Sequence, residues 1–323
     1  MTQDARFPDT LDVEGHLRAV LGDLEPDAGV LIGIDRRPNP QMSSAPSEVV
    51  TCRFGSGERL PLLLKYDHPD LTGDSGHWVS VGHEIRVYRD ILQTLPVRVP
   101  RYYGAFTIGA TGQSCLVLEW VDGQEQWEKI KQADVIMMLA AQWLGQFHAA
   151  AEAHIRAGLM PSLETYNVEY YTQYTRRIID DAGPLHERFP WLRKLCKRFE
   201  KASPLLANGA LTLIHGEYYV RNILWTGTDV CTVDWQSAAI ARGEVDVASL
   251  TEGWDQEVDD RCESEYVRSR WGGEAPGGFH EVLALARVYW PLRWLSRDPR
   301  TIRERHLKYL DSLPIMGARA GLL

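Results

Sequence analysis

The 323-residue sequence predicts an α+β protein in which a small, β-rich N-terminal part precedes a larger, mainly helical C-terminal part. Up to about residue 121, strand-like apolar segments alternate with turn-forming residues. From about residue 133, the apolar residues recur at helical spacing. A short β-rich insert between residues 211 and 237 interrupts these helices. Because the length suits two lobes, we expect an N-terminal domain over 1–121 and a C-terminal domain over 122–323.

The N-terminal part shows five strand-like segments and two helical ones. A helix over 11–22 precedes three strands, which are joined by a polar segment and by the turn GSGE, so that they form an antiparallel meander. A helical segment follows, and two more strands complete the order β-β-β-α-β-β, which is typical of a small α+β lobe. The strands are expected at 29–36, 47–54, 59–66, 97–108 and 114–121, and the second helix at 82–92.

The C-terminal part is helical in pattern, apart from the β-rich insert. Residues 133–154 carry apolar side chains at i, i+3 and i+4, and residues 164–201 favour two further helices. The tail from residue 243 is again helical and is interrupted by GGEAPGG at 272–278. His148 lies on an apolar helical face, so we interpret it as a core histidine.

The composition of the chain argues against several classes of function. The formal net charge of −9 argues against a nucleic-acid partner, because a phosphate backbone needs a basic face. The five cysteines are scattered without a CxxC pair, which favours reduced thiols over a zinc site or a disulfide framework. The N-terminus has no apolar targeting segment, and no apolar run reaches membrane-spanning length. We therefore expect a cytoplasmic protein without a membrane partner; its oligomeric state cannot be deduced from the sequence.

The strongest chemical signal lies in residues 215–236, where HGEYYVRN is followed by ILW, the turn TGTD and VCTVDWQ. The turn predicts a hairpin, whose open end would carry Asn222 and Asp234, with Glu217 on the preceding loop. An amide oxygen and a carboxylate that converge suit Mg²⁺, which prefers oxygen ligands. A second carboxylate nearby suits proton transfer from an attacking hydroxyl. Asn222 or Asp234 taken alone would more often be a turn cap.

In combination, HGExxxxN and VDWQ resemble the catalytic loop and metal-binding motif of the aminoglycoside phosphotransferase and choline kinase family, which has a bilobal protein-kinase-like fold. In members of this family the two motifs read HGDxxxxN and [IV]DWE. The segment ARGEVDVASL is similar to the family's next conserved segment. The resemblance implies that Glu217 is the catalytic base and that Asn222 and Asp234 hold magnesium. It also implies that His215 and Asp246 brace the loop.

The resemblance extends to nucleotide binding. It implies that Lys65, at the end of the strand RLPLLLKY, pairs with Glu84 of the next helix and grips the phosphates of ATP. Glu119 and Val121 match the hinge strand, whose backbone binds the adenine edge. The phosphate-covering loop is expected at 38–46, where Ser43 and Ser44 stand in place of glycines. Gly55 and Gly57, by contrast, suit an ordinary turn between strands.

Two features leave alternatives open. Glu217 replaces the family's aspartate and moves the carboxylate by about 1–1.5 Å, a shift of the size that can cost about 10²-fold in rate. The sequence therefore predicts an ATP- and Mg²⁺-dependent small-molecule kinase with a compensating loop; the alternative is a catalytically degenerate nucleotide-binding scaffold or sensor.

The acidic run 252–265 would suit a cationic acceptor, although a solvated acidic helix face explains it as well. Aminoglycoside-like antibiotics, sugars and amino alcohols remain open as acceptors, as does GTP in place of ATP.

Overall fold

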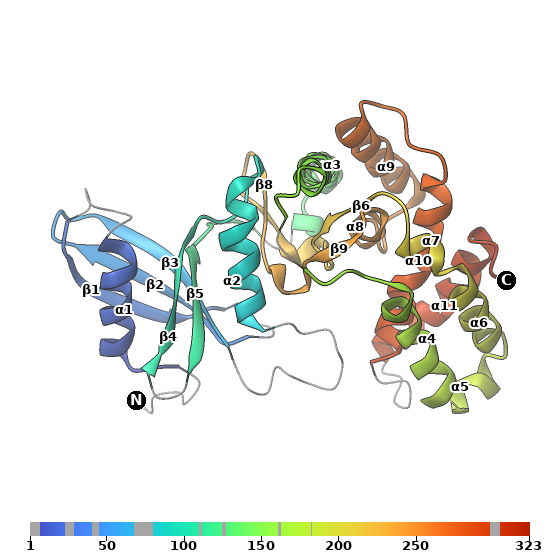
Figure 1. Cartoon of the computed structure of the whole chain (residues 1–323), viewed down its shortest axis with the longest axis horizontal. Helices are drawn as coiled ribbons and strands as arrows, with labels where there is room; N and C mark the ends of the chain where they lie inside the picture. Colours follow the sequence, from blue (N-terminus) through green and yellow to red (C-terminus); the bar gives the residue numbers. More distant parts are fainter. Residues whose placement is uncertain are drawn as a thin grey trace. The chain divides into compact units, whose positions relative to one another are not determined.

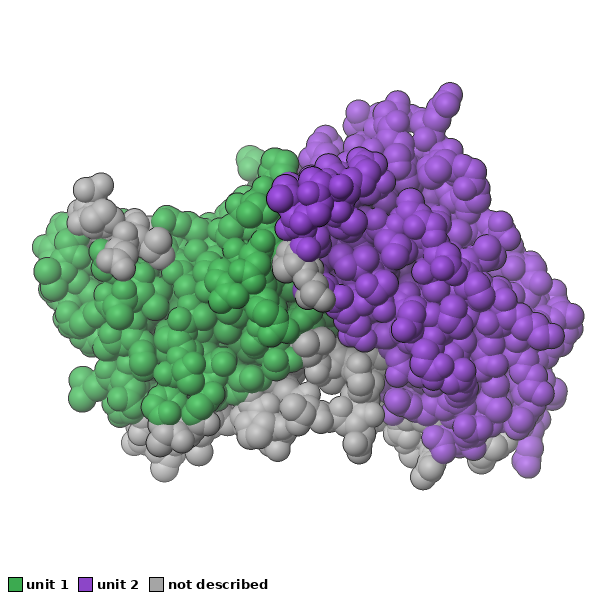
Figure 2. All heavy atoms as spheres, viewed as in Figure 1, with its two compact units in different colours: residues 1–124, 224–237 green, residues 125–223, 238–323 purple. Residues whose placement is uncertain are grey.

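The computed structural model divides into two compact units, formed by residues 1–124 with 224–237 and by residues 125–223 with 238–323 (Figure 2). The functional division into domains 1–121 and 122–323 stays a prediction. The structure describes residues 7–22, 29–40, 45–67, 80–109, 112–124, 127–160, 163–181, 183–297 and 304–323.

Unit 1 is built on a five-stranded antiparallel sheet with the order β1-β2-β3-β5-β4. The predicted order β-β-β-α-β-β is confirmed, and the turn at Gly55–Gly57 joins β2 to β3, with Gly57 at a φ of 91°. Alternating apolar residues fill the face of the sheet on which α1 lies (Figure 1). The elements are α1 (Thr10–Gly22), β1 (Leu31–Pro38), β2 (Ser47–Phe54), β3 (Arg59–Tyr66), α2 (Val81–Asp90), η3 (Leu92–Thr94), β4 (Tyr102–Ile108) and β5 (Gln113–Glu119).

The predicted hairpin is present as β7 (Ile223–Trp225) and β8 (Val230–Thr232), closed by a hydrogen bond of 3.0 Å from the Thr226 amide to the Asp229 carbonyl. Leu224 and Cys231 of the hairpin pack against Val121, which follows β5. The short helix η7 (Trp235–Ser237) then packs against α2. Asp234, which precedes η7, is thereby fixed beside the sheet of unit 1.

Unit 2 is mainly helical and is organised around α3 (Ala133–Arg156), which packs along α9 (Gln256–Trp271) (Figure 1). Gly145 permits this close contact, because a Cβ there would lie 2.8 Å from the Tyr266 carbonyl oxygen. The remaining helices are α4 (Val168–Asp181), α5 (Gly183–Arg188), α6 (Trp191–Ala202), α7 (Pro204–Ala207), α8 (Glu244–Leu250), α10 (Phe279–Leu295), α11 (Glu304–Arg319), η5 (Trp127–Lys129) and η6 (Val220–Asn222).

One expectation about unit 2 was wrong in detail, and one strand was missed. The segment 164–201 holds three helices rather than two, and a fourth, α7, follows it. Prolines stand at the starts of α5, α6 and α7, where a fixed φ and the missing amide hydrogen favour a new helix. The strand β9 (Ala239–Arg242), which pairs antiparallel with β6 (Leu211–Ile214), was not predicted.

Within the described part of the chain, each helix falls short of the length or the apolarity that crossing a membrane would require.

Candidate functional site

Three charged side chains predicted for the site meet in unit 1. The Lys65 Nζ lies 2.8 Å from Glu84 Oε2 and 2.6 Å from Asp234 Oδ1. Lys65 is supplied by the end of β3 and Glu84 by the first turn of α2, and both side chains are almost fully buried. A single ammonium group therefore lies between two carboxylates, of which Asp234 is the more exposed, at 23% of its side chain.

The backbone around Asp234 explains how its carboxylate is presented. Among the described residues, Asp234 is the one non-glycine residue with a positive φ, at 67°. Asp and Asn tolerate this left-handed conformation better than other residues with a Cβ. The next amide, that of Trp235, donates a 3.0 Å hydrogen bond to Glu84 Oε1, so one glutamate binds both the lysine and the turn that carries Asp234.

Electrostatics keep Lys65 charged in this position. Burial alone would lower its pKa, but the negative charges of Asp234 and Glu84, together with their hydrogen bonds, outweigh this effect and raise the pKa above its usual range. Lys65 thus remains a cation at physiological pH.

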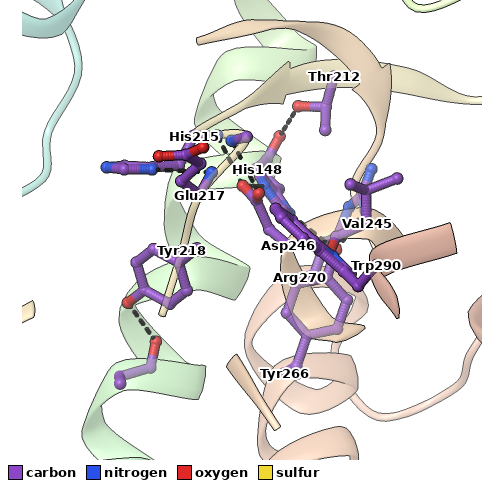
Figure 3. A network of polar contacts seen from close by, with 12 residues as sticks. His148, Thr212, His215, Glu217, Tyr218, Val245, Asp246, Tyr266, Arg270 and Trp290 are labelled. Carbon is purple, nitrogen blue, oxygen red and sulfur yellow. Dashed lines mark hydrogen bonds and ion pairs between the residues drawn. The ribbon is translucent and has the colours of Figure 1, made fainter. Parts of the chain in front are cut away.

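The HGE loop of unit 2, formed by His215, Gly216 and Glu217, is fixed by hydrogen bonds to Asp246 of α8 (Figure 3). Its Oδ2 accepts a 2.6 Å hydrogen bond from the His215 amide, and its Oδ1 accepts a 2.9 Å bond from the Gly216 amide. The His215 Nδ1 in turn accepts from the Glu217 amide at 3.2 Å. His215 and Asp246 are both fully buried, so the loop that presents Glu217 is fixed by buried hydrogen bonds.

His148 of α3 extends this network (Figure 3), and its complete burial agrees with the prediction of a core histidine. Its Nε2 lies 3.3 Å from Asp246 Oδ2, and its Nδ1 lies 2.8 Å from the Tyr266 hydroxyl, which also receives a hydrogen bond from Arg270. A neutral imidazole with its proton on Nε2 satisfies both contacts, because it donates to Asp246 and accepts from Tyr266.

We expect this histidine to make the protein sensitive to mild acid. Burial lowers the pKa of His148 below 6.5, and the hydrogen bond with Asp246 opposes this shift only in part. Below pH 6.5 the unfolded chain therefore binds a proton that the folded chain rejects, and stability falls as the pH falls. The loss of stability should therefore set in as the pH falls through 6.5 and grow towards pH 5.5.

Urea unfolding of wild type and His148→Gln at pH 7.5 and at pH 5.5 measures this contribution. The variant should lose less stability on acidification than the wild type. Equal losses in the two proteins would contradict the prediction.

Glu217 itself is buried, with 4% of its surface exposed. Its Oε1 accepts a 2.8 Å hydrogen bond from Arg293 Nη2, and its Oε2 lies 3.4 Å from the Tyr219 hydroxyl. Arg293 comes from α10 and was not anticipated from the sequence. One signal pointed to it: a single arginine within the otherwise apolar stretch VYWPLRWL.

Asn222 and Asp234 supply oxygen atoms of the kind that a magnesium ion would need. Asn222 ends η6, and its Nδ2 donates a 3.0 Å hydrogen bond to the Glu217 carbonyl, which leaves its amide oxygen as the ligand atom. Asp234 contributes a partly exposed carboxylate. Amide and carboxylate oxygens match the preference of Mg²⁺. That the two residues meet at one ion stays a prediction.

The remaining predicted nucleotide-binding residues lie in or beside β5, or outside the described part of the chain. The Glu119 side chain accepts hydrogen bonds from Arg98 and from the Arg101 amide, so its carboxylate braces the strand end. Val121 is buried against the hairpin. Ser43 and Ser44 lie outside the described residues. Adenine binding along this strand stays a prediction.

Unit 2 also contains a cavity of about 360 Å³ beside part of the acidic run. Asp259 and Arg287 face each other there at 3.3 Å, and Arg287 also pairs with Glu263 at 2.6 Å. Burial raises the pKa of Asp259 to about 6. Trp254 and Trp290 add aromatic walls. The acidic run is thus partly neutralised by arginine, and its role toward a cationic acceptor stays a prediction.

Solved structures with the same fold are numerous. Choline kinase from Cryptosporidium parvum Iowa II is 13% identical, with a TM-score of 0.64 and 98% of each chain covered. The GDP complex of aminoglycoside 2'-phosphotransferase IIIa is 15% identical, with a TM-score of 0.60, 94% of this chain and 97% of that chain covered. Macrolide 2'-phosphotransferase from Brachybacterium faecium is 18% identical, with a TM-score of 0.57, 95% of this chain and 98% of that chain covered.

These likenesses establish the protein-kinase-like fold, with its small β-rich and larger helical parts. No curated protein matches the chain significantly in sequence. A family model described as "phosphotransferase enzyme family" matches residues 53–281, which is more than half of the chain, and the chain therefore belongs to this family.

Proposed function

We propose that the protein is an ATP- and magnesium-dependent phosphotransferase that moves the γ-phosphate onto a hydroxyl group of a small molecule. The observation that carries the proposal is the buried Lys65, held at 2.8 Å by Glu84 and at 2.6 Å by Asp234. A lysine fixed in this way is suited to bind the phosphates of a nucleotide, and a partly exposed aspartate beside it is suited to hold the accompanying metal.

In this proposal, the residues of the site have separate roles. Lys65 binds phosphate oxygens, with Glu84 fixing its position, and Asp234 and Asn222 would hold the magnesium ion. The ion supplies charge neutralisation at the transferring phosphate. Glu217, on the loop that Asp246 braces, orients the acceptor hydroxyl and receives its proton. Positioning and charge complementarity, rather than a covalent intermediate, would provide most of the rate.

The proposed acceptor class is inferred from similar structures rather than from a contact in this chain. Solved structures with a similar fold include a choline kinase, an aminoglycoside phosphotransferase and a macrolide phosphotransferase. We therefore propose an aminoglycoside-like antibiotic, a sugar or an amino alcohol as the acceptor. One of these neighbours binds GDP, so GTP must be compared with ATP as the donor.

A coupled measurement of ADP or GDP release tests the proposal directly. The purified protein is incubated with ATP or GTP and with amino sugars, amino alcohols, nucleosides or macrolides. We expect one acceptor class to raise turnover well above the acceptor-free rate, and EDTA to abolish it, because the Asp234 and Asn222 oxygens need the ion to engage phosphate. Nucleotide binding without turnover for any acceptor would favour the alternative of a nucleotide-binding scaffold. Turnover unaffected by EDTA would remove magnesium from the proposal.

A further inference from the structure

The buried Arg293 binds the HGE loop at two points. Its Nη2 donates to Glu217 Oε1 at 2.8 Å, and its Nη1 donates to the Gly216 carbonyl at 2.9 Å. Arg293 is 1% exposed and Glu217 is 4% exposed. A planar guanidinium that binds a side chain and the adjacent backbone at once fixes the direction of the carboxylate as well as its charge.

The arginine is itself held in a fixed place. Its guanidinium carbon lies 4.8 Å from the centre of the Trp290 ring, one turn earlier on α10. The Trp290 indole donates a 2.8 Å hydrogen bond to the Val245 carbonyl on α8 (Figure 3). Val245 is next to Asp246, which binds the amides of the same loop. The HGE loop is therefore fixed by Asp246 on its backbone and by Arg293 on its side chain, and the two supports are joined through Trp290.

The length of residue 217 matters in this arrangement. An aspartate would withdraw the carboxylate by about 1–1.5 Å if the backbone stayed in place. A 2.8 Å contact with Arg293 would then exceed hydrogen-bond distance, and the buried guanidinium would lose its counter-ion. The extra methylene of glutamate is what allows the carboxylate to reach the arginine.

We propose that Arg293 is the positioning residue of Glu217, and that the two form a matched pair in which the arginine compensates for the longer acid. The inference rests on the proposed phosphotransfer. It predicts that Glu217→Asp, which restores the usual sequence of the family, lowers activity instead of raising it. It also predicts that Arg293→Met lowers kcat while the KM for ATP is nearly unchanged, because Arg293 acts on the carboxylate that orients the acceptor.

Steady-state ADP release, with the best acceptor of the panel or with water, tests the pair. We expect kcat to fall about 10²-fold in Arg293→Met and by at least about 10-fold in Glu217→Asp, with KM for ATP within about threefold. Arg293→Lys should recover part of the loss, since an ammonium group can replace one of the two hydrogen bonds. The matched control is Arg242→Met, which breaks a different, partly buried arginine–glutamate pair of unit 2, that with Glu244, and should leave kcat within about threefold.

Unfolding gives a readout that does not depend on catalysis. Urea midpoints of Glu217→Gln, Arg293→Met and the double variant form a cycle, in which a matched pair gives a strongly non-additive result. Additive midpoints, or a Glu217→Asp variant as active as wild type, would overturn the pairing. A wild-type protein that turns over no nucleotide would contradict the proposed function, and the unfolding cycle alone would then decide whether Arg293 and Glu217 are coupled.

Discussion

Replacing Asp234 with asparagine should lower magnesium-dependent turnover by about 10³-fold or more. The change removes the negative charge that the proposed metal site needs, while it keeps the size of the side chain. It also keeps the backbone, because asparagine accepts the left-handed conformation that residue 234 adopts, with its φ of 67°. Alanine would add backbone strain to the loss of charge, so asparagine is the better substitution.

The measurement is kcat/KM at saturating magnesium, with circular dichroism as a check of folding. Lys65 keeps its 2.8 Å ion pair with Glu84 in this variant, so nucleotide affinity should change far less than turnover. Asp229→Asn is the control, since Asp229 is an exposed acid in the turn of the same hairpin. Activity of Asp234→Asn within tenfold of wild type would exclude this carboxylate as the principal metal ligand.

The arrangement of unit 1 could be predicted because its signals are local. Each strand ends at a turn or polar segment that the sequence shows, and the helix with Glu84 is the next described element after the strand with Lys65. Once that order is known, the positions open to the side chains of Lys65 and Glu84 are few. The contact of Lys65 with Asp234 spans 169 positions and was not predicted, because no local pattern links a strand end to a residue so distant in the chain.

For unit 2, local sequence patterns predicted less of the structure. The strand β9 has only four residues, AIAR, and exists because β6 supplies a partner, which local pattern cannot reveal. Arg293 is one of 35 lysines and arginines, and an arginine in a helix is usually a surface charge. Its burial against Glu217 depends on how α10 packs on the loop, so the residue that fixes the direction of the carboxylate could not be found from spacing.

Lys65→Met should have the other large effect, on both nucleotide binding and stability. Without the ammonium group, Glu84 and Asp234 lose their shared cation, and Glu84 is 1% exposed. Leaving buried charge unpaired should cost about 3 kcal/mol in unfolding free energy. The Kd for ATP should rise about 100-fold, because the cation proposed to bind the phosphates is gone. Lys197→Met, at an exposed position of α6, should change neither quantity.

A second variant separates the two effects. In Lys65→Met/Glu84→Gln, the buried carboxylate of residue 84 becomes a neutral amide that can still accept the hydrogen bond from the Trp235 amide. Stability should therefore recover by about 1–2 kcal/mol. ATP affinity should stay at the level of the single variant, because no cation has been restored. Calorimetric titration and thermal unfolding measure the two quantities. If affinity returned together with stability, Lys65 would be a structural cation of unit 1 and another residue would have to bind the phosphates.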